Sequence, residues 1–425
     1  MERPCDHGVP TLVQATLDRH GDRDVDSSLD VIRAFSDILG CEAICLAYSK
    51  TPEHVDLFSF IYQLHCARHL DCMDPRDKVF AFLDHFSFYT EMAAFRESLR
   101  ADYIASETEI YMRVATAALL YPGSEPLIVL AAVQRLSMPF LSLRGGPIPL
   151  VARGSSSETA SIVRFDPTYT EHRLPTWVPD WTADFGIEML SRPTSPHRAG
   201  YINENNRRSE VHIVSDGVIR IRGVRVDWIA ETWKLDTRTS MAENVCEIWK
   251  KLISMAPEDQ SKFRTGEREW LLALLQTLSN GCVLIARNRG DEHHYSEIPK
   301  TEWFRYGLAW LVNSGKAEML ESAGVLPNGV PDPDIFASDA WYRAAHAVCH
   351  GRRFGITRRG FCVLGPEDLA EGDTVAILLG GKTPFCPREF DGGYLLVGES
   401  YVYGFMNGEA LKETTGEEFI DFDIF

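Results

Sequence analysis

The sequence lacks the short motifs that identify the common enzyme classes. It contains no GxxxxGK[ST] phosphate-binding loop, GxGxxG dinucleotide turn, GxSxG nucleophile elbow or HExxH zinc pair. The aspartate-rich DDxxD run, which would hold Mg²⁺ and diphosphate in an ionising terpene cyclase, is also absent. Motifs alone therefore assign no reaction, and we expect no cofactor.

Long apolar runs and paired cysteines are missing as well. No apolar stretch approaches the roughly 18 residues that a membrane-spanning helix needs. The first residues, MERPCDHGVPTLVQ, have neither the basic start nor the apolar segment of a secretory signal, so we expect a cytoplasmic protein without a membrane span. The ten cysteines include no CxxC pair, which favours reduced, buried thiols over a disulfide framework.

Positive charge is scarce relative to negative charge. Against 61 acidic residues the chain has 43 Lys and Arg, which gives a formal net charge of −18. Such a chain repels phosphate backbones, and no basic stripe interleaved with aromatic residues offsets the repulsion. We therefore expect no nucleic-acid partner.

The hydrophobic pattern predicts an α+β fold with several regions. A chain of 425 residues exceeds the size of a single ordinary core. Residues 1–143 show helical periodicity, and residues 144–205 form a loop-rich connection that contains LPTWVPDW. Residues 206–240 and 350–425 form a β-unit, and residues 241–349 form a helical insertion within it.

The β-unit begins with a predicted hairpin. VHIVSD and GVIRIRGVRVDWIAETW alternate between apolar and polar residues on either side of Asp216-Gly217, which is a typical hairpin turn. Short β-like runs recur from 354 to 405, each bounded by Gly or Pro. We expect these runs to pair with residues 211–234 in a small β-barrel or sandwich.

The segment DPRDKVFAFLDHF specifies a helix start. Asp74 is a suitable N-cap, Pro75 suits the first helical position, and Asp77 faces the positive helix end. An apolar stripe at helical spacing follows, made of Val79, Phe82, Leu83 and Phe86. A second start is predicted by the capping box from Ser106 to Glu109.

Two groups of residues are candidates for binding an ion. In LHCARHLDC, His65 and His69 lie one helical turn apart, but His65 and Cys66 project about 100° apart, so ordinary packing is favoured over a metal that would also need Cys72. His346 and His350 are interpreted in the same way. The second group consists of four arginines, Arg352, Arg353, Arg358 and Arg359. They form either an anion-binding site or a solvated strand edge, and the strand edge is favoured.

Aromatic residues gather in two segments. In LPTWVPDW, Trp177, Asp180 and Trp181 either wall a ligand pocket or form a rigid loop whose tryptophans cap the helical core, and the loop is favoured. In YLLVGESYVYGF, Tyr401 and Tyr403 share one face of a strand, which is either core or cavity wall.

Taken in order, four blocks give the chain a family resemblance: DPRDKVFAFLDHF, ADYIASETEIY, LPTWVPDW, and TRRGFCVLGPEDLAEGDTVAILLGGKTPF with YLLVGESYVYGFMNGEA. In this order they resemble fungal heterokaryon-incompatibility (HET) proteins. The YxALSYxWG and WIDxxCINQ segments that usually precede the first block have no match in residues 1–70, so the chain looks like the companion region of a HET protein without its signature domain. In such a scaffold, Arg76 and Asp77 are expected to tie the helix start to a neighbouring loop.

The resemblance implies two principal functions. HET-like proteins in fungal secondary metabolism imply a cofactor-free pericyclase, closing a Diels-Alder [4+2] ring on a hydrophobic terpenoid in a shaped apolar pocket. The alternative is an incompatibility or immune-type regulator that binds a protein partner or a nucleotide. An NAD-cleaving enzyme would be a third, but it needs a catalytic glutamate in a domain that we do not find.

The pericyclase hypothesis assigns roles to seven residues. The catalytic candidates are Arg76, Tyr401 and Tyr403, and the substrate-binding candidates are Trp177, Asp180, Trp181 and Tyr394; no metal ligand is assigned. The two functions predict different surfaces. A pericyclase needs an enclosed apolar cavity of several hundred Å³, whereas a regulator exposes an apolar patch.

Overall fold

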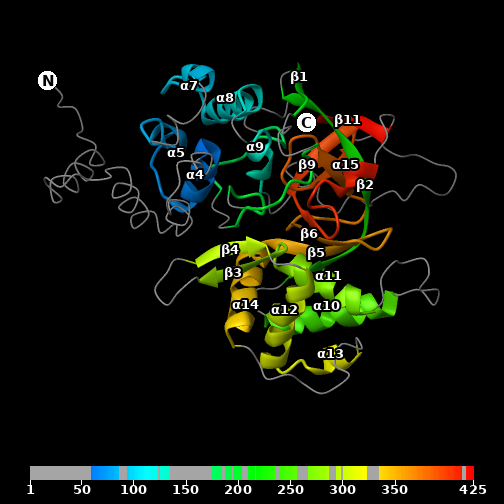
Figure 1. Ribbon diagram of the computed structural model, residues 1–425. Coiled ribbons are helices and arrows are strands. Elements are labelled where there is room, and N and C mark those ends of the chain that lie inside the picture. The colour runs from blue at the N-terminus through cyan, green and yellow to red at the C-terminus, as the bar shows by residue number, and fades with distance from the viewer. Residues whose placement is uncertain are drawn as a thin grey trace, which may run out of the picture. The chain divides into compact units, whose positions relative to one another are not determined.

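The computed structural model describes residues 59–85, 93–122, 125–134, 174–183, 187–193, 195–202, 209–215, 217–235, 240–255, 267–286, 293–297, 300–322, 335–413 and 418–425. The chain divides into two compact units, residues 1–57 with 286–294, and residues 58–285 with 295–425. The second unit contains nearly all of the described residues (Figure 1). No helix among the described residues is long and apolar enough to cross a membrane.

Helices dominate the first part of the second unit, and strands dominate its C-terminal part, so the predicted α+β class is confirmed. The first helices are α4 (Phe60–Cys66), η2 (Ala67–His69), α5 (Asp77–Phe80), α7 (Ala93–Ser98), α8 (Glu107–Leu120) and α9 (Ile128–Ala131). The predicted capping box is present at α8: Glu109 N–H donates to Ser106 Oγ (3.3 Å), and Ser106 N–H donates to the Glu109 carboxylate (2.7 Å).

The prediction for DPRDKVFAFLDHF was wrong about where the helix begins. Asp74 does not cap α5; its carboxylate accepts the Arg76 N–H (3.0 Å) in a turn that precedes the helix, and α5 starts at Asp77. The helix has only four residues, because after Ala81 the next N–H, that of Phe82, bonds three residues back to Val79 O (3.0 Å). Val79 is buried, and Phe86 lies outside the described residues.

The strands form a barrel. β2 (Val218–Lys234) pairs with β11 (Phe419–Ile424), which continues through β9 (Gly393–Glu399), β8 (Phe385–Phe390) and β7 (Thr374–Leu378) back to β2. The far end of β2 pairs with β5 (Arg352–Thr357), followed by β6 (Cys362–Pro366) and β10 (Tyr401–Val402). β1 (Val211–Ser215) pairs with the start of β2, so the predicted hairpin and its pairing with the later strands are confirmed.

Side chains fill the barrel and pack on its outside. Alternate residues of the strands point inward and form one apolar cluster, which includes Ile229, Val363, Val375, Leu395 and Val397. Side chains therefore occupy the barrel interior.

The opposite face of β5, β6 and β10 packs on helices that lie between β2 and β5 in the chain (Figure 1): α10 (Met241–Met255), α11 (Glu267–Leu278), α12 (Lys300–Asn313), α13 (Glu318–Ser322) and α14 (Ile335–Cys349). A short α15 (Glu409–Glu413) precedes β11, and β3 (Cys282–Ala286) with β4 (His293–Glu297) forms a separate two-stranded sheet.

Candidate functional site

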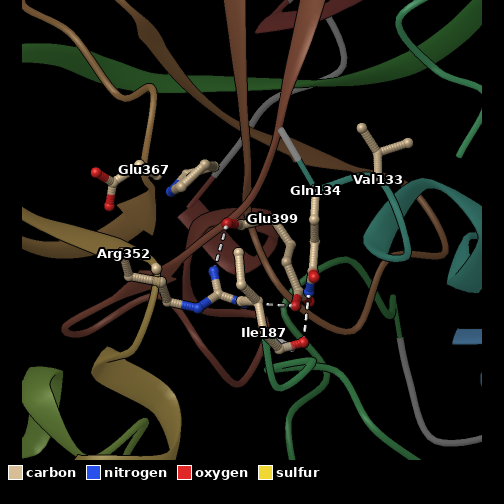
Figure 2. Close-up of a pocket in the computed structure, with 8 residues that line it drawn as sticks. Val133, Gln134, Ile187, Arg352, Glu367 and Glu399 are labelled. Carbon is tan, nitrogen blue, oxygen red and sulfur yellow. Dashed lines mark hydrogen bonds and ion pairs between the residues drawn. The ribbon is translucent and has the colours of Figure 1, made fainter. Parts of the chain in front are cut away.

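A small cavity lies where the helical region, the loop that begins at Ile187 and the barrel meet. Figure 2 shows the residues that line it, which come from the segment after α9, from the loop, and from β5, β6 and β9 with their adjoining residues: Val133, Gln134, Ile187, Gly351, Arg352, Pro366, Glu367 and Glu399. It comprises about 220 Å³ of space outside atoms, part of it open to solvent, with room for about one water molecule. The cavity is therefore much smaller than a terpenoid substrate requires.

Glu399, at the end of β9, is the buried carboxylate of this site and is only 1% exposed. Its Oε1 accepts the N–H of Leu190 (2.6 Å), and its Oε2 accepts the N–H of Ser191 (3.0 Å). Arg352 Nη2 and Thr383 Oγ1 complete the set at 3.1 and 3.3 Å. Four donors therefore hold a carboxylate that would be costly to bury without partners.

Arg352, the first residue of β5, is the counter-charge and is 2% exposed. Besides the Glu399 carboxylate, its guanidinium donates to Glu399 O (3.3 Å) and to Glu188 O (2.9 Å), as the dashed lines in Figure 2 show in part. Burial lowers the pKa of Arg352 from its ordinary value, and the Glu399 charge opposes that shift. The solvated strand edge that the sequence favoured for Arg352 is therefore wrong.

Two further buried side chains hold the same loop from the helical side. Gln134 Nε2 and His65 Nε2 both contact Ile187 O, at 3.0 and 2.9 Å. The loop backbone from Ile187 to Ser191 is thus fixed by α4 and the segment after α9 on one side, and by β5 and β9 on the other. We call the network that Glu399, Arg352, Gln134 and His65 form with this loop the polar latch, because it joins the helical region, the loop and the barrel.

The latch offers little chemistry. The Glu399 carboxylate is occupied by four donors, and no serine, threonine or cysteine in this cluster is paired with a histidine base as a nucleophile would require. Among the described residues, no group of three or more His, Cys, Asp or Glu could hold a metal ion. The geometry therefore supports a structural role for this buried ion pair.

Arg76 holds a loop. Its Nη1 donates to Tyr103 O (2.6 Å) and Ala105 O (2.9 Å), while Nε and Nη2 donate to the Asp74 carboxylate (2.9 and 2.7 Å). Asp77 accepts the Tyr103 hydroxyl (2.6 Å). The expected tie between the helix start and a neighbouring loop is confirmed, and the predicted catalytic role of Arg76 stays a prediction.

The tryptophans of LPTWVPDW are buried in the protein. Trp177 is 1% exposed and donates through Nε1 to Gly217 O (2.9 Å), and Trp181 is 0% exposed with its ring edge-on to Tyr111 at 5.2 Å. Asp180 is half-buried and accepts the Thr182 N–H and hydroxyl (2.9 and 2.5 Å). These contacts agree with the rigid loop that the sequence favoured.

The predicted tyrosines lie in different surroundings. Tyr401 belongs to the cluster under the helices, with its ring 5.8 Å from that of His197, and Tyr403 packs on the same cluster, whereas Val402 points into the barrel. Tyr394 is half-buried on β9, accepts Arg225 Nη2 (2.8 Å) and packs against Phe422. None of the seven predicted site residues lines the cavity beside Arg352.

Comparison with known proteins finds similarity in a C-terminal segment of the chain. Residues 332–422 match the Het-6 beta-barrel domain. Heterokaryon incompatibility protein 6, OR allele, of Neurospora crassa is 36% identical over 90 residues, which are 20% of this chain and 13% of that protein. No solved structure shows significant similarity to the chain. The predicted HET resemblance is therefore supported in the C-terminal segment.

The matched Het-6 segment begins three residues before α14 and ends within β11. It includes Arg352 and Glu399, the two members of the buried ion pair. It excludes β2, although β2 pairs with β5, β7 and β11 and closes the barrel. It also excludes the loop whose Leu190 and Ser191 N–H groups bind Glu399. Barrel and latch are thus completed by segments upstream of the match.

Two buried histidines predict how stability depends on pH. Burial lowers the pKa of His65 and of His197 to about 3, and neighbouring positive charges add to both shifts, mainly Arg68 for His65 and Lys382 for His197. Between pH 3 and 6.5 the unfolded chain therefore binds more protons, so the free energy of unfolding falls on acidification, by up to about 1.4 kcal/mol per pH unit for each histidine. Urea unfolding across this range measures the slope.

The variant His197→Gln removes one titrating group and keeps a side-chain nitrogen for Asn280, whose carbonyl oxygen lies 3.0 Å from His197 Nε2. We expect it to reduce the pH slope of the unfolding free energy by the amount that corresponds to one proton, about 1.4 kcal/mol per pH unit. The exposed His346→Gln substitution is the matched control. Equal slopes in the two variants would show that His197 is not held neutral by burial.

Proposed function

We propose that the chain is a heterokaryon-incompatibility-type regulator that acts by binding a protein partner. The observation that carries this proposal is the match of residues 332–422 to the Het-6 beta-barrel domain. The buried apolar cluster inside the barrel supports it, because side chains that occupy a barrel interior leave the outer surface for recognition.

Exposed apolar side chains supply a surface of the kind that a regulator needs. Met73 and Ile104 are fully exposed, and Tyr103 is 56% exposed. Met73 immediately precedes Asp74, and Ile104 lies between the two carbonyls that Arg76 holds, so both flank one rigid network. Holding apolar groups in place before binding reduces the entropy lost on association.

The cofactor-free Diels-Alder cyclase stays a hypothesis with less support. Its proposed pocket residues Trp177 and Trp181 are buried against protein groups, and the cavity beside Arg352 has room for about one water molecule. A new product isomer of unchanged mass, formed faster with purified protein than in buffer, would revive it.

Partner capture in Neurospora crassa cells tests the proposed regulator. With the chain fused to a proximity-labelling enzyme, quantitative mass spectrometry should detect a partner whose capture falls about tenfold or more in the Met73→Ser/Ile104→Ser variant. Losing the burial of two apolar side chains would cost more than the roughly 1.4 kcal/mol that a tenfold change represents. The growth rate of heterokaryons should change with the same variant.

Ile335→Ser/Phe336→Ser is the matched control, because these residues are 72% and 90% exposed at the start of α14, outside the Arg76 network. It should leave partner capture unchanged. If no protein is enriched, or if both double variants capture the same proteins to the same extent, the proposal is wrong.

A further inference from the structure

Three arginines gather around half-buried aromatic rings at one end of the barrel. The guanidinium carbons of Arg225 and Arg358 lie over the Trp228 ring, 5.1 and 5.2 Å from its centroid. Arg359 lies over Phe361 at 5.1 Å. We call Arg225, Trp228, Arg358, Arg359 and Phe361 the arginine–aromatic patch.

The backbone that carries the patch is rigid. Arg358 and Arg359 occupy the tight turn between β5 and β6, in which Gly360 N–H donates to Thr357 O (2.9 Å) and Gly360 has a φ of +88°. The turn is fastened to β2, because Arg358 N–H donates to Trp228 O (2.9 Å) and Arg359 N–H donates to the buried Asp227 carboxylate (2.7 Å). The patch is therefore formed before any ligand arrives.

Two of the three guanidiniums in the patch, those of Arg358 and Arg359, have no carboxylate partner among the described residues, since the nearby Asp227 carboxylate accepts a backbone N–H. Arg358 and Arg359 are exposed, and in the part of the chain that the structure describes neither guanidinium forms an ion pair or a hydrogen bond. Arg225 donates to the Tyr394 hydroxyl and forms a long ion pair with the 61% exposed Glu389 (3.9 Å). In a chain of net charge −18, two adjacent free guanidiniums with flat aromatic neighbours are conspicuous.

We propose that the arginine–aromatic patch binds an anionic segment of a protein partner. Guanidinium groups donate paired hydrogen bonds to carboxylate or phosphate, and the stacked rings hold them in position while offering an apolar surface to flanking residues. Long polyanions and anionic membranes fit less well, because they must approach the large negative charge of the remaining surface. This inference rests on the proposed partner-binding function and names the chemistry of the bound segment.

Fluorescence anisotropy with labelled synthetic peptides tests the patch. The probes are a glutamate-rich peptide, the same sequence with phosphoserine at the acidic positions, and its glutamine counterpart. Both anionic peptides should bind, more weakly as salt increases, and the glutamine peptide should not. Tighter binding of the phosphoserine peptide would assign the segment to a phosphorylated partner, and tighter binding of the glutamate peptide to an acidic one.

The variant Arg358→Gln/Arg359→Gln should weaken binding of the anionic peptides about tenfold or more. Its matched control is Lys251→Gln/Arg343→Gln, which removes the same charge from exposed positions on α10 and α14. Because Arg358 and Arg359 are exposed, the variant should keep the circular dichroism and melting temperature of the parent protein.

Equal weakening in the two double variants, or tighter binding of single-stranded RNA or phosphatidylserine vesicles than of the peptides, would overturn the inference. If partner capture through Met73 and Ile104 persists but no anionic peptide binds, the inference fails and the proposed function stands. If the peptides bind at the patch but no partner is captured, the proposed function fails alone.

Discussion

Replacing Glu399 with alanine is expected to lower the free energy of unfolding by about 3–5 kcal/mol. The substitution leaves the Arg352 guanidinium buried without its counter-charge, and it removes the acceptor of the Leu190 and Ser191 N–H groups. Each buried donor that loses its partner adds a desolvation penalty. The loss should appear as a lower urea midpoint in equilibrium unfolding followed by circular dichroism.

Two comparisons separate this effect from a general loss of charge. Asp339→Ala removes the partner of Arg343 in an exposed pair on α14 and should cost no more than about 1 kcal/mol. The double variant Arg352→Met/Glu399→Leu removes both buried charges and should recover part of the loss in Glu399→Ala, because no unpaired ion remains. If Glu399→Ala costs no more than Asp339→Ala, the latch does not hold the loop.

The latch also explains which parts of the structure depend on one another. Glu399 and Leu190 are 209 positions apart, and Arg352 and Glu188 are 164 apart, yet both pairs are in direct contact. Gln134 and His65 reach the same loop from the helical region. A buried polar network of this kind is stable only when all of its parts are in place, so we expect the loop, the helices and the barrel to unfold together.

The sequence predicted the features that depend on neighbouring residues. The capping box at Ser106 and Glu109 and the hairpin around Gly217 follow from local hydrogen bonding and turn geometry, and both are present. The prediction that Asp74 caps a helix was wrong, because its carboxylate closes a short turn instead. Local chemistry alone left these two possibilities open.

The buried ion pair could not be predicted in the same way, because its partners are brought together by the fold. In the sequence, Arg352 is one of four arginines that are interpreted together as a strand edge or an anion site. A partial signal for Glu399 was present, because it is a charged residue at the end of the apolar run YLLVG, which is typical of a buried strand. A carboxylate there needs buried donors, although the sequence does not say which residues supply them.

Replacing Trp181 with alanine is the second substitution with a large expected effect, and it distinguishes a packing role from a pocket role. Trp181 is 0% exposed and packs edge-on against Tyr111, whose hydroxyl donates to Pro75 O (2.7 Å). It therefore joins the LPTWVPDW loop to α8 and to the turn that carries Arg76. Removing a buried tryptophan leaves a large cavity, so we expect a loss of about 3–5 kcal/mol in the free energy of unfolding.

Trp181→Phe and Phe336→Ala complete this test. Phenylalanine keeps a ring against Tyr111 and should cost clearly less than alanine, while Phe336 is 90% exposed and its loss should stay within about 0.5 kcal/mol. A pocket wall facing a ligand cavity would behave differently: Trp181→Ala would leave the urea midpoint near that of the parent protein and abolish ligand binding. Because Trp181 lies against protein atoms on the helical side, we expect the unfolding measurement to show the large change, which would place LPTWVPDW in the scaffold that supports the exposed Met73 and Ile104 surface.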